Sequence, residues 1–262
     1  MISNIFKYAI TFCAIIIVSQ SNYSFAAREK IVLAADYWCP YNCHPEDEKP
    51  GFLVELATKV FSIYGVEVEY RLMPWYEALD KAEKGEIDGV IGISQGFTQD
   101  LAITSSPQAK SVISAFTRPD TEWVYDGIDS LKGKRASIIL DYNLTDILKQ
   151  YVSANYSRTP DLFVLEDGEN AVIDSINYLV EGNVDVYIED ELVVNYYLNK
   201  HNLMPAVKNA GRVDRTPLSL YIAFSKKIEN SDKYLEMLEN GVSSITATKD
   251  IDDLKKKYNI SH

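Results

Sequence analysis

The feature that most constrains the fold is an order of strands and helices that occurs twice along the chain. Residues 31–35 form an unbroken apolar run typical of a buried strand, and residues 51–61 follow with apolar side chains at helical spacing. After an alternating strand segment, Pro74 opens a second helix that Gly85 ends, and residues 87–93 form another apolar strand. This order predicts an α/β fold with a mainly parallel sheet flanked by helices.

The middle of the chain repeats this plan. Strands are predicted at residues 137–140, 162–165 and 184–188, and helices at residues 145–152 and 170–181. A second sheet of the same kind is therefore expected.

The two runs share a motif at corresponding positions. Gly85-Glu86-Ile87-Asp88 and Gly182-Asn183-Val184-Asp185 each join a helix end to a strand, and each begins with a glycine suited to a left-handed helix cap. This similarity predicts two lobes built alike. The remaining strand at 218–224 and helices at 232–242 and 251–258 are too few for a separate core, so they are expected to pack on the first lobe.

The lobe boundaries follow from where the chain would cross between them. Proline and polar residues at 117–120 and 215–217 indicate hinge segments. Lobe 1 is therefore expected at 27–117 together with 218–262, and lobe 2 at 118–217.

The N-terminal segment has the pattern of a targeting signal. An apolar run at 8–18 is too short to span a bilayer and ends, after a polar stretch, in small residues. The pattern predicts a signal peptide, residues 1–26, cleaved after Ala26 or Ala27, and hence a periplasmic protein. An uncleaved anchor is the alternative.

The charge balance restricts the partners. With 38 acidic and 26 basic side chains the net charge is −12, which opposes binding to nucleic acid or to an anionic membrane surface. A monomer that binds a small polar solute is expected.

Two cysteines follow the predicted signal peptide, within Trp38-Cys39-Pro40-Tyr41-Asn42-Cys43. An oxidising compartment favours a disulfide between Cys39 and Cys43. A metal site that includes His44 and a free thiol pair are the alternatives, but three soft ligands within six residues suit zinc poorly. No metal and no cofactor is therefore predicted.

Several segments in a fixed order resemble a known family. They are Trp38-Cys39-Pro40-Tyr41, Gly51-Phe52 with Glu55, Gly85-Glu86-Ile87-Asp88, Ser130-Leu131-Lys132-Gly133-Lys134, Gly182-Asn183-Val184-Asp185 with Asp190, and residues 254–258. From Ile31 to Ile260 the chain resembles the extracellular solute-binding proteins of the polar amino acid uptake family, family 3. The resemblance implies a two-lobed periplasmic-binding-protein type II fold, a ligand cleft between the lobes, and the membrane subunits of an ABC importer as partners.

The resemblance also implies ligand-binding residues. Trp38 would stack on the ligand, and the loop with Gly92, Ser94 and Gln95 would offer hydrogen bonds. The loop with Tyr142 and Asn143 would hold a carboxylate with its amides, although Asn143 alone is read as a helix cap. Asp190 would pair with an amino group, or else cap the helix that begins at Glu191.

Two further aromatic residues are cleft candidates from the sequence itself. Tyr41 lies in the cysteine loop after a strand end, where binding residues gather. Trp75 opens the second helix and either lines the cleft or covers the core of the first lobe.

The chain departs from the family pattern at residues 98–102, which contain no arginine where the family places a carboxylate clamp. An ordinary α-amino acid is therefore in doubt, and a cationic, zwitterionic or neutral polar ligand is favoured. Arg118, in the expected hinge, is the candidate to replace this clamp.

An enzyme is the main alternative class. Gly92-Ile93-Ser94-Gln95-Gly96 matches the nucleophile elbow G-x-S-x-G, but the histidines, His44, His201 and His262, do not follow the pattern of a triad. A dehydratase on the same fold would use Glu189 or Asp190 as its acid. A ligand-sensing accessory protein is the third alternative. We expect a binding protein and not an enzyme.

Overall fold

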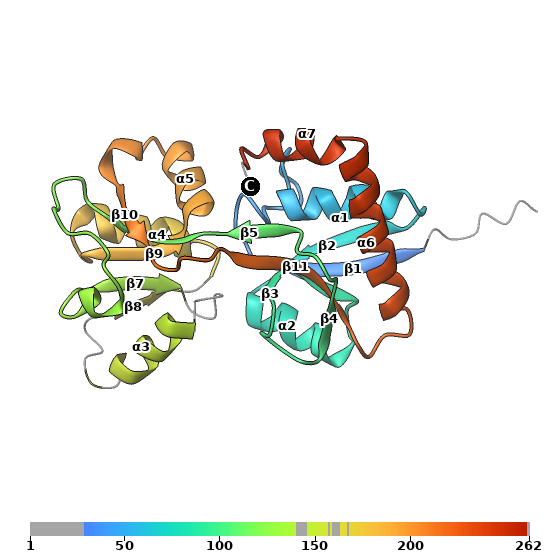
Figure 1. Ribbon diagram of the computed structural model, residues 1–262, viewed down its shortest axis with the longest axis horizontal. Coiled ribbons are helices and arrows are strands. Elements are labelled where there is room, and N and C mark those ends of the chain that lie inside the picture. The colour runs from blue at the N-terminus through green and yellow to red at the C-terminus, as the bar shows by residue number, and fades with distance from the viewer. Residues whose placement is uncertain (1–28, 140–145, 157, 159–162, 167, 261–262) are drawn as a thin grey trace, which may run out of the picture.

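The computed structural model describes residues 29–139, 146–156, 158, 163–166 and 168–260. The predicted signal peptide and the candidate residues Tyr142 and Asn143 lie outside this part of the chain. The described residues form two lobes, each built around one sheet, with β5 and β11 running toward the junction between them (Figure 1). Within the same residues, no helix has both the length and the apolar character needed to cross a membrane.

The first lobe contains a six-stranded sheet. Strand β1 pairs in parallel with β2 and β3, while β11 pairs antiparallel with β3, β4 and β5. The strands are β1 (Lys30–Ala35), β2 (Glu67–Leu72), β3 (Gly89–Ser94), β4 (Leu101–Ile103), β5 (Ala109–Ser111) and β11 (Leu218–Ser225).

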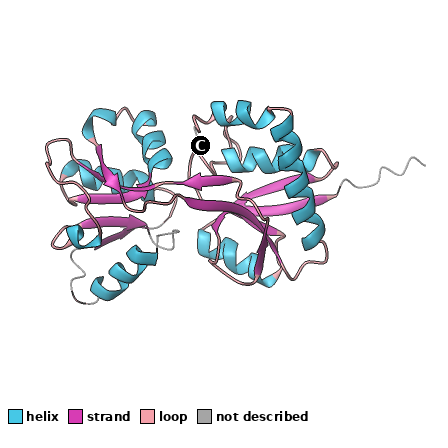
Figure 2. Cartoon of the chain, in the orientation of Figure 1, coloured by secondary structure: helices cyan, strands magenta, loops and turns pink. Residues whose placement is uncertain are grey.

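Helices cover both faces of this sheet because successive strand residues point to opposite sides. Ile31 and Leu33 of β1 pack on the side of α1 (Phe52–Ser62) and α6 (Ser231–Ala247), while Ala34 packs on the side of α2 (Trp75–Lys84). Helix α7 (Asp250–Lys257) packs on α1 and α6. The C-terminal helices therefore pack on the first lobe (Figure 2).

The second lobe contains a five-stranded sheet in the order β10-β6-β9-β7-β8. Strand β7 pairs in parallel with β8 and β9, and β6 pairs antiparallel with β9 and β10. Its strands are β6 (Ile113–Thr117), β7 (Ala136–Ile139), β8 (Phe163–Glu166), β9 (Val186–Asp190) and β10 (Lys208–Arg212). Its helices are α3 (Asp146–Tyr156), α4 (Ala171–Glu181) and α5 (Glu191–Lys200), with short 3-10 turns at Ile128–Leu131 and Met204–Ala206.

The shared glycine–aspartate motif has the same structure in both lobes. Gly85 and Gly182 end α2 and α4 in the left-handed conformation, with φ of 77° and 79°. Asp88 then accepts a hydrogen bond from the amide of Val32 at 2.7 Å, and Asp185 accepts one from the amide of Arg135 at 3.0 Å. Each aspartate thus ties the segment after a helix to the neighbouring parallel strand, which explains the repeated spacing.

The chain first passes between the sheets at Val112, between β5 and β6, and returns between β10 and β11. The first passage precedes residues 117–120, where proline and polar residues had indicated it. Arg118 has a different role, because its Nη1 donates to the carbonyl oxygens of Leu179 and Val184 at 2.9 and 2.8 Å. It therefore fastens the end of α4 within the second lobe and is not a ligand clamp.

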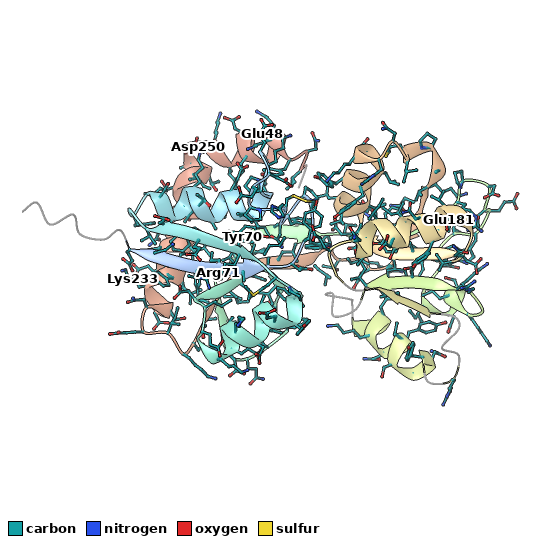
Figure 3. The ribbon with its side chains drawn as sticks, turned by 180° about the vertical axis from the view of Figure 1, so that it is seen from behind. Glu48, Tyr70, Arg71, Glu181, Lys233 and Asp250 are labelled. Atoms are coloured by element: carbon teal, nitrogen blue, oxygen red, sulfur yellow. A yellow bond between two sulfur atoms is a disulfide. The ribbon has the colours of Figure 1, made fainter. Side chains whose placement is uncertain are left out.

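Charged side chains lie over the outside of both lobes (Figure 3). The acidic residues 46–48 are exposed, and so is Glu181 at the end of α4.

Candidate ligand-binding cavity

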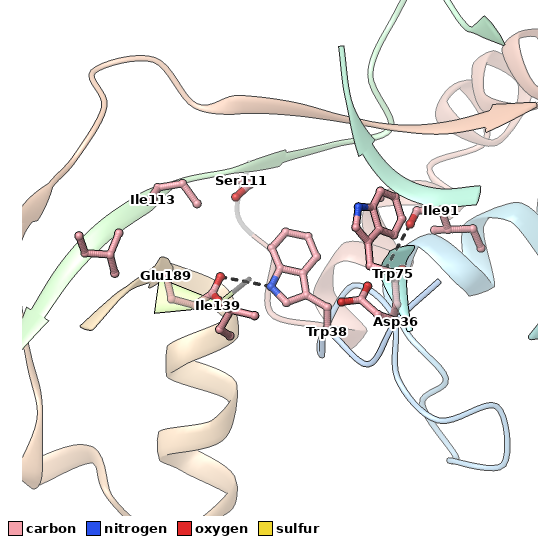
Figure 4. A pocket seen from close by; sticks show the side chains of 11 residues that line it. Asp36, Trp38, Trp75, Ile91, Ser111, Ile113, Ile139 and Glu189 are labelled. Atoms are coloured by element: carbon pink, nitrogen blue, oxygen red, sulfur yellow. Dashed lines mark hydrogen bonds between the residues drawn. The ribbon is translucent and has the colours of Figure 1, made fainter. Parts of the chain in front are cut away.

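A cavity that is partly open to solvent lies between the two lobes. Both lobes contribute to its wall, mainly with aromatic and isoleucine side chains and a few polar groups (Figure 4). The lining residues are Asp36, Trp38, Asn42, Trp75, Ile91, Gly92, Ser111, Ile113, Ile139, Ile188 and Glu189.

Trp38 is held against the cavity by the short loop that follows β1. The Cys39–Cys43 disulfide closes this loop, with 4.9 Å between the Cα atoms, and the peptide bond between Cys39 and Pro40 is cis. Tyr41 stacks on the Trp38 indole with 4.6 Å between ring centroids. The predicted disulfide is present, and the loop that it closes contains Tyr41, whose ring packs on the indole of Trp38.

Tyr41 itself does not line the cavity. It is fully buried, and its hydroxyl donates to the carbonyl oxygen of Lys110 at 2.8 Å and to the Asp190 carboxylate at 3.3 Å. Burial, together with the nearby Asp190 charge, raises the pKa of Tyr41 well above its usual value. Tyr41 therefore links the lobes and supports Trp38, and is not placed to touch a ligand.

Glu189 is the acidic residue that the second lobe presents to the cavity. Its Oε1 accepts hydrogen bonds from Trp38 Nε1 at 3.2 Å and from the Asp190 amide at 2.7 Å. Its Oε2 accepts one from the Tyr187 hydroxyl at 3.3 Å. Burial raises the pKa of Glu189 to about 8 against the effect of these donors, and the neighbouring Asp190 charge adds to the rise. The carboxyl is thus largely protonated at neutral pH.

Asp190 is the N-cap of α5. Its Oδ1 accepts from the amides of Leu192 and Val193 at 2.8 and 3.0 Å, and its Oδ2 accepts from the Val112 amide at 2.9 Å. Burial raises its pKa to about 6, although these amides favour the charged form. The resemblance had implied that Asp190 would pair with a ligand's amino group. In the structure the Asp190 carboxylate accepts hydrogen bonds from backbone amides, and it is not among the residues that line the cavity.

The stability of the protein is expected to fall between pH 6 and 8 because of Glu189. An unfolded glutamate loses its proton near pH 4.5, whereas the native carboxyl keeps it until about pH 8. The native state therefore binds more protons than the unfolded state in this window, and the free energy of unfolding drops by roughly 1.4 kcal/mol per pH unit as pH rises.

Urea denaturation at pH 6, 7 and 8 measures this slope. Glu189→Gln keeps the shape of the side chain and should remove most of the slope, whereas Glu181→Gln, at an exposed carboxyl, should retain it. Equal slopes in the two variants would contradict the assignment. Asp190, with a pKa of about 6, contributes to the slope near pH 6 in both variants, so the difference between the two slopes above pH 7 is the part that Glu189 accounts for.

Gly92 lines the cavity as the extra residue of a bulge in β3. Ile91 pairs with Ile222 and Ile93 with Tyr221, so the register of the two strands shifts at Gly92. Its φ is 94°, which favours glycine, and a Cβ there would lie 3.2 Å from Nδ2 of Asn42. The bulge turns the backbone of Gly92 toward the cavity.

The other sequence candidates divide into two groups. Trp75 lines the cavity from the start of α2 and also packs edge-on against Phe97, so it serves both the cavity and the core. Ser94 ends β3 and Gln95 is exposed, and neither lines the cavity.

The two histidines that the structure describes, His44 and His201, both lie in other contacts and do not complete a triad with the G-x-S-x-G segment at residues 92–96. His201 ends α5 in the second lobe and stacks on Tyr197, while Nδ1 of His44 accepts from the Glu46 amide. In the part of the chain that the structure describes, no three His, Cys, Asp or Glu side chains cluster as a metal site would require.

Eight of the lining residues were not predicted to bind the ligand; of these, Glu189 had been named only as the acid of a possible dehydratase, and Ile91 and Ile188 lie in predicted strands. Asp36 follows β1, where sites commonly form in α/β sheets, so its position was a usable signal. Ser111 and Ile113 flank the first passage between the sheets, and Ile139 ends β7. Asn42 lies in the cysteine loop beside Gly92.

Further contacts join the lobes beside the cavity. Tyr37 of the first lobe packs edge-on against Tyr197 of α5, and Lys200 Nζ donates to the Tyr37 hydroxyl at 3.4 Å. On α3, Lys149 Nζ lies 5.3 Å from the ring centroid of Phe97. The two lobes therefore meet at the cavity wall and next to it.

Two lobes of this topology with a cavity between them define a protein of the periplasmic-binding-protein type II class. The chain belongs to the bacterial extracellular solute-binding proteins, family 3, whose family model matches residues 31–261. A search of curated protein sequences finds no significant match.

Solved structures share the fold at low sequence identity. A histidine kinase sensor domain with similarity to periplasmic binding proteins has a TM-score of 0.73 at 21% identity, covering 88% of this chain and 96% of that one. An ancestral arginine-binding protein bound to arginine has a TM-score of 0.71 at 19% identity, covering 88% and 98%.

A third similar structure comes from work on glutathione import through GshT and the cystine ABC importer TcyBC of Streptococcus mutans. It has a TM-score of 0.73 at 13% identity, covering 88% of this chain and 95% of that one. The family and these neighbours are binding proteins and a sensor domain.

Proposed function

We propose that this protein is exported to the periplasm and captures a small polar solute in the cavity between its lobes, for delivery to an ABC importer. The observation that supports this most directly is the composition of the cavity wall. Trp38 and Trp75 come from the first lobe and Glu189 from the second, so a bound solute would touch both. Contacts to both lobes stabilise their approach, which is how a hinged binding protein retains its ligand.

The ligand contacts that we propose are those of the cavity wall. Trp38 and Trp75 provide apolar faces, Asp36 and Glu189 provide polar groups from opposite lobes, and Gly92 provides backbone. Ser94 and Gln95 stay candidates only for a longer ligand that reaches beyond the cavity.

A thermal-shift screen tests the binding function. Protein purified from the periplasm of cells that express the full chain would be melted with amino acids, polyamines, organic cations, organic acids and sugars. A solute that binds only the native state stabilises it by about 2.7 kcal/mol at a hundredfold excess over its Kd, which a melting curve readily shows. A chain that responds to none of them would contradict the proposal.

The same preparation tests export. Intact mass measurement is expected to show loss of the first 26 or 27 residues. An undiminished mass, or protein found only in the cytoplasmic fraction, would contradict a cleaved signal peptide.

Ligand sensing is the second candidate function, because a histidine kinase sensor domain shares this fold over 96% of its length. Measuring uptake of the labelled solute by cells with and without the gene distinguishes delivery to an importer from ligand sensing. Loss of uptake supports delivery to an importer, whereas unchanged uptake with a lost transcriptional response supports sensing.

A further inference from the structure

Two neighbouring carboxyl groups are buried at the place where the lobes meet. Glu189 and Asp190 are the last two residues of β9 in the second lobe, and their exposed fractions are 4% and 0%. Two like charges that lie close together and away from water are costly unless a cation compensates them. The contacts of this carboxyl pair therefore decide whether both groups stay charged.

The hydrogen bonds that described residues donate to the pair come from neutral groups. Glu189 accepts from the Trp38 indole, the Tyr187 hydroxyl and one backbone amide. Asp190 accepts from the Tyr41 hydroxyl and three backbone amides. None of the ion pairs among the described residues includes either carboxyl. Burial of the pair therefore favours one bound proton, and the three amides that favour a charged Asp190 leave that proton on Glu189.

The first lobe covers this pair with two side chains of the cysteine loop. Trp38 Nε1 lies 3.2 Å from Oε1 of Glu189 (Figure 4), and the Tyr41 hydroxyl lies 3.3 Å from Oδ2 of Asp190. Glu189 also lines the cavity between the lobes. Separation of the lobes would remove both aromatic side chains and bring water to the pair. The burial of Glu189 thus depends on closure of the lobes.

The other titratable groups around Glu189 do not oppose its protonation. Tyr187 on its own strand, Tyr197 on α5 and Tyr41 on the first lobe have pKa values raised by burial, so they are neutral. Asp36, on the cavity wall of the first lobe, is an acid, and a negative charge there favours the protonated form of Glu189.

We propose that closure of the lobes takes up a proton on Glu189, so that acid favours the closed molecule and alkali the open one. A glutamate in water loses its proton near pH 4.5, whereas the buried carboxyl keeps it until about pH 8. Between these values the closed molecule binds more protons than the open one. The ratio of closed to open molecules should therefore fall by up to about tenfold per pH unit as pH rises, and level off above pH 8.

Small-angle X-ray scattering without added solute tests the proposal. The protein is purified from the periplasm, dialysed exhaustively and measured between pH 6 and 9. The radius of gyration is expected to increase from pH 6 to pH 8.5, while far-UV circular dichroism stays unchanged, which separates opening from unfolding. A radius that is the same throughout this range would overturn the proposal. The test needs no ligand, so its failure leaves the proposed binding function intact.

Two variants assign the proton. Glu189→Gln keeps the shape of the side chain without titrating, so its radius should stay at the wild-type pH 6 value up to pH 9. Glu181→Gln, at an exposed carboxyl of the same lobe, should expand with pH as the wild type does. Melting curves check that both variants are folded. A Glu189→Gln protein that expands like the wild type would overturn the role of Glu189.

Discussion

Replacing Trp38 with alanine is expected to weaken solute binding by about a hundredfold, because a buried aromatic anchor at the centre of an interface commonly contributes this much. The Trp38 ring lines the cavity and its Nε1 donates to Glu189 across the lobes. The variant therefore loses an apolar face for the ligand and one interlobe hydrogen bond. The measurement is the ligand-induced rise in melting temperature, and calorimetry gives the affinity.

Trp123→Ala is the matched control. Trp123 is a half-buried tryptophan of the second lobe whose Nε1 donates to the Ser130 carbonyl at 3.2 Å and whose ring packs edge-on against Tyr125. It lies outside the cavity wall, so the variant should melt earlier but keep its response to the solute. A Trp38→Ala variant that binds as well as Trp123→Ala would contradict the ligand site.

Gly51→Ala is expected to destabilise the protein by about 3 kcal/mol or more, through overpacking and backbone strain together. Gly51 precedes α1 with φ of 121° and ψ of 145°, a region that is essentially restricted to glycine. An added Cβ would lie 2.3 Å from the carbonyl oxygen of Tyr41 and 2.8 Å from the Cα of Asn42. Relief of this clash would require the loop that holds Trp38 to move.

Gly65→Ala separates the two causes of this loss. Gly65 also has a positive φ of 72°, but an added Cβ would meet nothing within 4 Å. The variant should therefore lose only about 1–2 kcal/mol, the cost of a left-handed residue. Urea denaturation compares the two variants, and the Gly51→Ala protein should in addition show weaker solute binding. Equal losses of stability would contradict the close contact at Gly51.

The local elements of the fold could be predicted because their signals lie within a few residues. The helix at Trp75–Lys84 begins after Pro74 and ends at Gly85, as its sequence indicates. The strands that were missed, β4, β5, β6 and β10, are three to five residues long and pair antiparallel with distant segments. Such short segments have too few residues for a periodic pattern, so their pairing depends on the rest of the sheet.

The cavity could be predicted only in part. Of the residues that the sequence suggested as ligand contacts, Trp38, Trp75 and Gly92 line it. The sequence left Asp190 open as a ligand partner or a helix cap; in the structure it is the cap, and the acid of the second lobe that lines the cavity is Glu189. Neighbouring strand residues point to opposite sides, and the start of α5 takes the Asp190 carboxylate as its cap.

The sequence alone determined the α/β class, the two similar halves, the short cysteine loop and the family, because each depends on residue types at close spacing. Only the tertiary structure decided which side chains form the cavity, since Asp36, Ser111 and Glu189 come from three distant segments. The sheet order brings those segments together, and burial then sets the pKa of Glu189. Neither the contact between distant segments nor the loss of water around a side chain is a property of neighbouring residues in the chain.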